Sequence, residues 1–208
     1  MIINKNFVLI IISFFFLGNC KNPKNDNKMR KNKVSITKSF YGETKGNKKV
    51  DLYSFKNENG MQVDIINYGG IITSLKVPDK NGETENIVLG YSKLKDYINE
   101  NPYFGSIIGR YGNRIAKGKF NLNGNQYTLA TNNDENHLHG GNIGFDKVIW
   151  DAETKINSNS SSLILKYLSR DMEEGYPGNL YTTVTYKITN DNSVEIKYEA
   201  QTDKTTVI

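Results

Sequence analysis

Apolar and polar residues alternate along most of the chain, with a period close to two. Residues 194–200 place every second side chain on an apolar face and the charged side chains on the other, and residues 183–188 repeat the pattern. This alternation is typical of half-buried antiparallel strands. Because Asn190, Asp191 and Asn192 lie between the two segments as a turn, we predict a β-hairpin near residue 208.

A second hairpin is predicted around Asn123-Gly124, a pair favoured where both central turn residues need positive φ. Its strands are 119–122 and 126–129. Only Ser92–Ile98 suggests a short helix, and no internal repeat is visible. Many short strands separated by turns indicate an all-β sandwich; the remaining strand candidates are 34–41, 50–56, 61–67, 70–77, 85–90, 147–153 and 162–168.

The first twenty residues have the pattern of an export signal. Lys5 supplies the positive charge and residues 7–17 an apolar run that is short for a membrane span. The following Leu17-Gly18-Asn19-Cys20 resembles the lipobox of bacterial lipoproteins, in which the cysteine is acylated. Asn19 stands where a small residue is usual, so plain secretion with an unmodified Cys20 is the alternative. We expect export, to the bacterial periplasm or to a lipid anchor at Cys20.

The net charge of +5 belongs to this leader and to the segment after it. Residues 1–33 hold seven lysines and arginines against Asp26 alone, which leaves residues 34–208 nearly neutral. Residues 21–33 are rich in lysine and asparagine, as expected for a flexible tether. A nearly neutral body gives no support to a nucleic-acid partner. The single cysteine excludes an internal disulfide and a multi-cysteine zinc site.

Glycine, asparagine, arginine and histidine gather in residues 101–151, where loops on a rigid sheet can carry binding groups. Gly105, Gly109 and Gly112 are a weak nucleotide signal, since no lysine-serine pair or helix follows. Arg110 and Arg114 lie close together in a chain with few arginines, which favours planar, bidentate contacts over solvated surface charge. Asn113-Arg114 and Asn136–Gly141 supply fixed donors and a titratable imidazole, a set suited to sugar hydroxyls.

The spacing of His137 and His139 would put both rings on one face of a strand. We predict no metal there, because no third ligand has suitable spacing. The tandem glycines Gly140-Gly141 would let the backbone approach a ligand closely.

Five ordered motifs and two shorter ones resemble the aldose 1-epimerase family, the galactose mutarotases, over residues 34–208. The resemblance implies a large antiparallel β-sandwich, of which this stretch is the N-terminal part, and a cleft for an aldohexose such as galactose or glucose. The motifs are Tyr103–Arg110, Asn113–Gly118, Asn136–Gly141, Gly144–Lys147 with Trp150, and Glu174–Leu180, together with Asn67–Gly70 and Thr202–Lys204.

By this resemblance, Asn113, Arg114 and His139 contact the substrate, and His139 is a catalytic residue. His137 falls at a position where the motif specifies no residue type, and it is interpreted as a loop or rim residue. Phe145 and Trp150 are interpreted as packing aromatics, while Asp171, Glu173 and Glu174 are interpreted as solvated loop charges and Tyr176-Pro177-Gly178 as a turn.

The reaction that the resemblance implies needs no cofactor. A carboxylate takes the proton of the anomeric hydroxyl, a histidine protonates the ring oxygen, and the opened sugar closes on its other face. In the family, a second histidine, an aspartate and a glutamate of the site follow the Thr-Asp-Lys strand, and none can be assigned within 208 residues. We therefore expect little or no mutarotase activity from this polypeptide alone. A non-catalytic carbohydrate-binding module and a non-functional fragment of an interrupted gene are the alternatives.

Overall fold

The computed structural model describes residues 33–208, which form thirteen strands, one short α-helix and three single-turn 3₁₀ helices. The strands are β1 (Val34–Glu43), β2 (Lys49–Asn57), β3 (Gln62–Ile66), β4 (Ile72–Pro78), β5 (Thr84–Asn86), β6 (Arg114–Ile115), β7 (Lys119–Leu122), β8 (Asn125–Thr128), β9 (His137–Leu138), β10 (Asp151–Ile156), β11 (Ser160–Ser169), β12 (Leu180–Thr189) and β13 (Val194–Thr202). The helices are α1 (Leu94–Glu100), η1 (Ala116–Gly118), η2 (Phe145–Lys147) and η3 (Glu173–Gly175).

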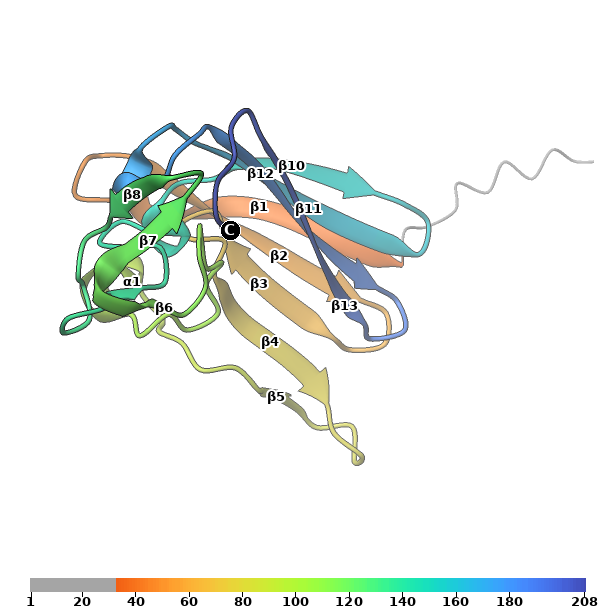
Figure 1. The fold of residues 1–208 in the computed structure, drawn as a ribbon. Coiled ribbons are helices and arrows are strands. Elements are labelled where there is room, and N and C mark those ends of the chain that lie inside the picture. The colour runs from red at the N-terminus through yellow and green to blue at the C-terminus, as the bar shows by residue number, and fades with distance from the viewer. Residues whose placement is uncertain (1–32) are drawn as a thin grey trace, which may run out of the picture. The chain divides into compact units, whose positions relative to one another are not determined.

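Two antiparallel sheets carry the fold (Figure 1). One has the order β1-β2-β3-β4-β5 and the other β10-β11-β12-β13, so neighbours along the chain are neighbours in the sheet. Two small pairs, β6-β9 and β7-β8, lie in the segment between the sheets. Figure 1 shows this segment gathered at one end of the sheets, around α1. The sheets therefore act as a rigid base for the connecting loops, where binding groups are expected.

The main core cluster combines the inward faces of both sheets. Phe55, Val63 and Ile65 come from the first sheet, and Leu163, Leu165 and Val184 come from the second. Trp150 and Phe145 complete the cluster as buried rings in edge-to-face contact, which confirms their interpretation as packing aromatics. Because the sheets share one core, the predicted all-β sandwich is confirmed.

Most predicted strands lie where the alternation placed them. The hairpin of β12 and β13 pairs Ile188 with Val194 and Leu180 with Thr202. Asn123 and Gly124 have φ values of 52° and 80°, as the predicted turn requires. The short helix is confirmed as α1, two residues later than expected.

The prediction of a strand over 85–90 is wrong beyond Asn86. The side-chain oxygen of Asn86 accepts the backbone N–H of Leu75 at 2.9 Å, which occupies a donor that a continuing strand would use. The prediction over 147–153 is wrong before Asp151, because residues 145–147 form η2. After η2, the backbone N–H of Trp150 donates to the backbone oxygen of Asn67, just beyond the end of β3, at 2.8 Å.

The predicted signal peptide, Cys20 and all but the last residue of the predicted tether lie outside the described residues. Within residues 33–208, no helix is long and apolar enough to cross a membrane.

Candidate active site

A short ladder brings together the two loop segments that the sequence singled out. β6 and β9 pair antiparallel, with Arg114 opposite Leu138 and Ile115 opposite His137. Beyond this ladder, Asn113 and His139 face each other through two hydrogen bonds. The backbone N–H of His139 donates to Asn113 O at 3.0 Å, and the backbone N–H of Asn113 donates to Nδ1 of His139 at 2.9 Å. The three predicted sugar-contacting residues are therefore adjacent in space.

This contact determines which nitrogen of His139 carries the proton. Nδ1 accepts the Asn113 N–H, so the neutral ring must carry its proton on Nε2. No described residue forms a hydrogen bond with Nε2, which leaves this N–H for a ligand. Burial lowers the pKa of His139 below its ordinary value of 6.5; Asp146 opposes the shift, and the Arg114 and Lys147 cations add to it. His139 is therefore a neutral hydrogen-bond donor at neutral pH.

Arg114 and Asn113 lie on the surface beside this imidazole. Nε of Arg114 donates to Asn133 Oδ1 at 2.8 Å, and Nη1 donates to Asn113 Oδ1 at 3.3 Å. These bonds fix the plane of the guanidinium and leave Nη2 of Arg114 and the Nδ2–H groups of Asn113 without hydrogen-bond partners among the described residues. The site is thus an open surface rich in donors, which suits a ligand with many oxygens.

Asn113 and His139 both have left-handed backbone conformations, with φ of 69° and 51°. Asparagine and histidine tolerate this region better than most residues. Strained backbone held in place by surrounding hydrogen bonds is frequent at functional sites. Here the strain turns the chain at the end of the ladder, where the side chains of Asn113 and His139 meet.

Tyr103 is a site neighbour that sequence reasoning missed. Its ring contacts the His139 ring edge-on, with centroids 4.6 Å apart, and Nζ of Lys147 lies 5.3 Å from its centroid. Lys147 is itself paired with the buried carboxylate of Asp146 at 2.8 Å. Tyr103 belongs to a motif quoted above, but no spacing rule places a residue 36 positions away against His139.

The interpretation of His137 as a rim residue is wrong. Its side chain is fully buried, Nδ1 lies 2.8 Å from Ala130 O, and Nε2 lies 2.7 Å from the Tyr176 hydroxyl. A carbonyl oxygen only accepts, so Nδ1 carries the proton and Nε2 accepts from Tyr176. Tyr176 is therefore a buried partner of His137 as well as part of a turn, and His137 is a structural residue.

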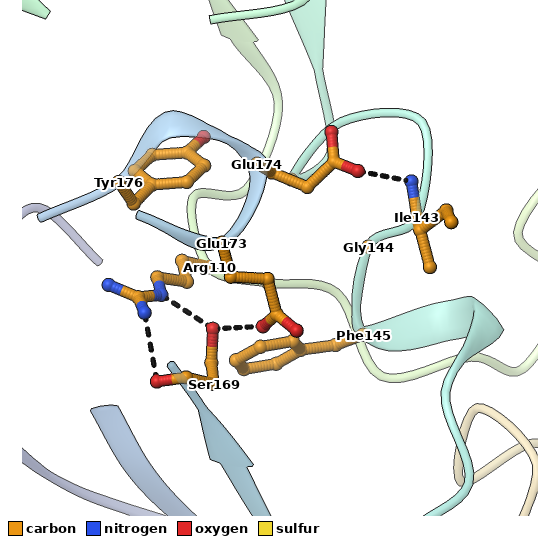
Figure 2. Close-up of a pocket in the computed structure, with 10 residues that line it drawn as sticks. Arg110, Ile143, Gly144, Phe145, Ser169, Glu173, Glu174 and Tyr176 are labelled. Atoms are coloured by element: carbon orange, nitrogen blue, oxygen red, sulfur yellow. Dashed lines mark hydrogen bonds between the residues drawn. The ribbon is translucent and has the colours of Figure 1, made fainter. Parts of the chain in front are cut away.

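The guanidinium of Arg110 forms the planar hydrogen-bond contacts that the sequence predicted, and all of its partners are groups of the protein itself. It is buried, and its guanidinium donates to the Ser169 hydroxyl at 2.8 Å and to the backbone oxygens of Ser169, Arg170 and Pro177 at 2.8–3.0 Å. Figure 2 shows Arg110 and Ser169 continuing to Glu173, which accepts from the Ser169 hydroxyl. Arg110 thus ties the loop before Asn113 to the end of β11.

The interpretation of Glu173 and Glu174 as solvated loop charges is wrong. Both are partly buried, and Glu174 accepts the backbone N–H groups of Asn142 and Ile143 at 2.9 Å each. Figure 2 shows the Glu174 carboxylate directed at Ile143. These backbone donors lack partners in their own loop, so a carboxylate reaching from η3 satisfies them. Glu174 therefore holds the loop that follows His139, while Glu173 accepts from the Tyr167 and Ser169 hydroxyls of β11.

Gly140 and Gly141 allow close packing within the protein. A Cβ on Gly140 would lie 1.7 Å from the Gly109 carbonyl oxygen, and one on Gly141 would lie 2.1 Å from the Glu174 carboxylate. The loops around residues 109 and 140 therefore meet backbone to backbone. Among residues 33–208, no group of three histidine, cysteine, aspartate or glutamate side chains could hold a metal ion.

Comparison with known proteins places this geometry in context. Residues 51–208 match the family model for aldose 1-epimerase. The chain is 43% identical to a galactose mutarotase of Sus scrofa over 176 residues, which is 84% of this chain and 50% of that protein. It is 35% identical to an aldose 1-epimerase of Escherichia coli over 74% of this chain and 43% of that protein.

Among solved structures, the chain resembles a galactose 1-epimerase from Lactobacillus acidophilus. The TM-score is 0.72 and the identity 31%, covering 83% of this chain and 50% of that one. The chain thus spans about half the length of the curated relatives it matches.

Proposed function

Since the chain belongs to the aldose 1-epimerase family, we propose that Asn113, Arg114 and His139 form the sugar-gripping part of an epimerase site. The substrate would be an aldohexose such as galactose or glucose, whose α and β anomers the enzyme interconverts. The observation that carries the proposal is the pair of hydrogen bonds between Asn113 and His139, which leaves the proton-bearing Nε2 without a partner among the described residues.

The chemistry of each group fits this task. The Nε2–H of neutral His139 can donate to a sugar oxygen, and the fixed guanidinium of Arg114 can donate to a neighbouring one. Ring opening moves the anomeric hydroxyl proton to a base, transfers a proton to the ring oxygen and breaks the bond between that oxygen and C1. Closure on the other face reverses these steps and gives the other anomer.

By the resemblance described in the sequence analysis, the acid and base for those transfers would follow residue 208. General acid and general base groups typically contribute about 10²–10⁴-fold each. We therefore propose that the 208-residue chain binds sugar while leaving mutarotation close to its spontaneous rate. Two alternatives remain proposals of their own: a carbohydrate-binding module, and a fragment without a function.

Sugar titration of the 208-residue chain tests the binding site. We expect saturable galactose or glucose binding in calorimetry, weakened at least about tenfold by His139→Ala or Arg114→Ala through loss of a charged or oriented donor. Arg170→Ala is the matched control, because it removes another exposed arginine. Equal losses in the Arg114 and Arg170 variants, or no binding by a folded chain, would contradict the proposal.

Polarimetry and the downstream DNA distinguish the alternatives. A rate well above spontaneous mutarotation, abolished by His139→Ala, would contradict the expected inactivity of this polypeptide. A reading frame that continues after codon 208 into an Asn-His segment with later aspartate and glutamate favours the epimerase. A stop codon there with saturable sugar binding favours the binding module, and an aggregated chain favours the fragment.

We also propose that the chain is exported and acylated at Cys20. The support is the sequence pattern of residues 1–20 alone. Mass spectrometry of the N-terminal peptide from a bacterial host tests it: a lipid-modified Cys20 is expected, and Cys20→Ser should release the protein from the membrane fraction. An intact leader, or an unmodified cysteine after cleavage, would overturn lipidation.

A further inference from the structure

The carboxylate of Asp146 is a buried charge that the proposed sugar contacts do not use. Asp146 is 3% exposed, and its Oδ2 lies 2.8 Å from Nζ of Lys147. Its Oδ1 is also buried and has no hydrogen-bond partner among the described residues. Removing the paired cation from a buried carboxylate leaves a charge uncompensated, which is strongly unfavourable. The Lys147 ammonium is therefore held in one place, although its side chain is 35% exposed.

The Asp146 carboxylate lies beside the loop that packs on His139. A Cβ added to Gly144 would lie 2.6 Å from the backbone oxygen of His139 and 2.8 Å from Oδ1 of Asp146. Because Gly144 has no side chain, both groups approach its backbone closely. The backbone N–H of Lys147 donates to Gly144 O at 3.0 Å and closes this turn. The ion pair is thus built next to the residue that carries the imidazole.

The ring of Tyr103 connects Lys147 to the His139 imidazole. Nζ of Lys147 lies 5.3 Å from the centre of the Tyr103 ring, within the range of a cation–π contact. The same ring meets the imidazole edge-on, with centroids 4.6 Å apart and an angle of 64° between the ring planes.

The backbone of Tyr103 is strained, like that of Asn113 and His139. Its φ of 66° lies in the left-handed region, which is uncommon for a bulky residue. Strain of this kind persists where the surrounding structure over-determines a conformation, and it gathers at functional sites. The place of the Tyr103 ring is therefore a built feature of the loop.

The His139 imidazole needs more than one contact to be held in one orientation. The terminal torsion of a histidine ring is broad and roughly twofold, so rotamer preference leaves the direction of Nε2 open. The N–H of Asn113, 2.9 Å from Nδ1, defines one point of the ring. The edge-on contact with Tyr103 supplies a second point. Together they fix the ring plane and the direction in which the Nε2–H can donate.

We propose that Asp146, Lys147 and Tyr103 are positioning residues of the sugar site, which orient the His139 imidazole through a chain of contacts. Asp146 holds the Lys147 ammonium, the ammonium lies on the Tyr103 ring, and the ring holds the imidazole. The inference rests on the proposed role of His139 as a donor to the sugar. The three residues act on the sugar through Nε2 of His139 and not by touching it.

The two charges of the pair give the proposal a signature in the titration of His139. Burial lowers the pKa of His139, Asp146 opposes this shift, and the Arg114 and Lys147 cations add to it. Lys147→Met should therefore raise the titration midpoint of His139 by about 0.2–0.5 pH units, and Asp146→Asn should lower it by a similar amount. The double variant should lie between the two. Nuclear magnetic resonance measures these midpoints, and a general loss of structure would not shift them in opposite directions.

Calorimetric titration with galactose tests the effect on the ligand. Tyr103→Leu should weaken galactose binding about threefold to tenfold, because the imidazole must then be ordered during binding. Tyr103→Phe keeps the ring and should stay within about twofold of the original affinity. The ¹⁵N chemical shifts of the imidazole should show the Nε2-protonated form in the original chain and in the phenylalanine variant. Exchange between the two neutral forms is expected in the leucine variant.

Lys166→Met is the matched control for Lys147→Met. It makes the same charge change and breaks an ion pair of similar length, 2.9 Å from Lys166 to Glu153, between β11 and β10. The His139 midpoint and the galactose affinity should both stay at their original values. Circular dichroism establishes that each variant is folded. If Asp146→Asn does not fold, the Lys147 and Tyr103 variants still decide the outcome.

Three results would overturn the proposal. One is a His139 midpoint that Lys147→Met leaves unchanged or shifts no more than Lys166→Met does. Another is an equal loss of affinity in Tyr103→Phe and Tyr103→Leu, which would make the Tyr103 hydroxyl a sugar contact. The third is an undisturbed Nε2-protonated form in Tyr103→Leu. If the original chain binds no galactose, the proposed sugar site fails, whereas the midpoints and the ¹⁵N shifts still decide whether these residues position His139.

Discussion

The two ends of the β6–β9 ladder hold histidines in opposite environments. At one end His137 is fully buried, with Ala130 O and the Tyr176 hydroxyl on its two ring nitrogens. At the other end His139 is partly exposed, and only its Nδ1 has a partner among the described residues. Two residues of the same type, two positions apart, thus serve packing in one case and a candidate sugar site in the other.

The difference teaches that hydrogen-bond partners, not residue type, decide what a histidine can do. A carbonyl oxygen on Nδ1 of His137 requires a proton there, whereas a backbone N–H on Nδ1 of His139 requires the proton on Nε2. The buried end anchors the ladder, and the open end presents a donor. Four changes test this contrast, from the largest expected effect to the smallest.

The strongest test removes the buried ring. His137→Ala should lower the free energy of unfolding by about 2–4 kcal/mol, because it creates a cavity and leaves the Tyr176 hydroxyl and Ala130 O without partners. His139→Ala, the matched control at the open end, should cost less than about 1 kcal/mol. Urea denaturation of both variants measures the difference. Equal losses of stability in the two variants would contradict the distinction between His137 as a buried anchor and His139 as a hydrogen-bond donor.

A finer test keeps the buried shape and removes one hydroxyl. Tyr176→Phe leaves Nε2 of His137 buried without a donor, which should cost about 1–2 kcal/mol in the same denaturation measurement. Sugar affinity should stay at its original value, since the open end is untouched. A loss of affinity comparable with that of His139→Ala would show that the two ends are not independent.

Asn113 separates backbone strain from side-chain chemistry at the open end. Its φ of 69° disfavours alanine, so Asn113→Ala should lose about 1 kcal/mol of stability, while Asn113→Gly should lose less. Both variants remove the amide that accepts from Arg114, and both should weaken sugar binding about threefold to tenfold. If only the alanine variant weakened binding, the backbone turn alone would explain the role of Asn113.

The pH dependence of His139 gives the smallest effect. The pKa of His139 is lower in the folded state than in the unfolded state, so the unfolded chain takes up the proton at a higher pH. His139 therefore lowers the free energy of unfolding as pH falls below about 6.5, and it adds no pH dependence above that value. Nuclear magnetic resonance should place its titration midpoint below 6.5. Arg114→Ala should raise that midpoint, since the Arg114 cation is one cause of the shift. A midpoint at or above 6.5 in the original chain contradicts the assignment.

Strand positions were predictable where each strand has one core face and one solvent face. β12 shows this most clearly, since its even-numbered residues are buried against the other sheet. The turn at Asn123-Gly124 was predictable because its φ values depend on those two residues alone. Residues 148–150 were misassigned, because their partners at residues 67–69 lie in the connection between β3 and β4, about eighty positions earlier, and leave no local pattern.

The candidate site divides in the same way. Asn113, Arg114 and His139 were found through motifs, and the ladder brings them together. The partners that position the surrounding loops were missed or misassigned, since Arg110 bonds residues about sixty positions away and Glu174 bonds a loop about thirty positions earlier. Polar contacts over such separations follow from the packing of whole elements and have no spacing rule.

The sequence by itself determined that this chain forms an antiparallel sandwich, and it identified the residues of its candidate sugar site, because alternation and motifs are local properties. Only the tertiary structure decided which histidine is buried and which glutamate holds the loop after His139. Those outcomes depend on partners far apart in sequence: His137 meets Tyr176 39 positions later, and Glu174 accepts from Asn142 and Ile143 about thirty positions earlier.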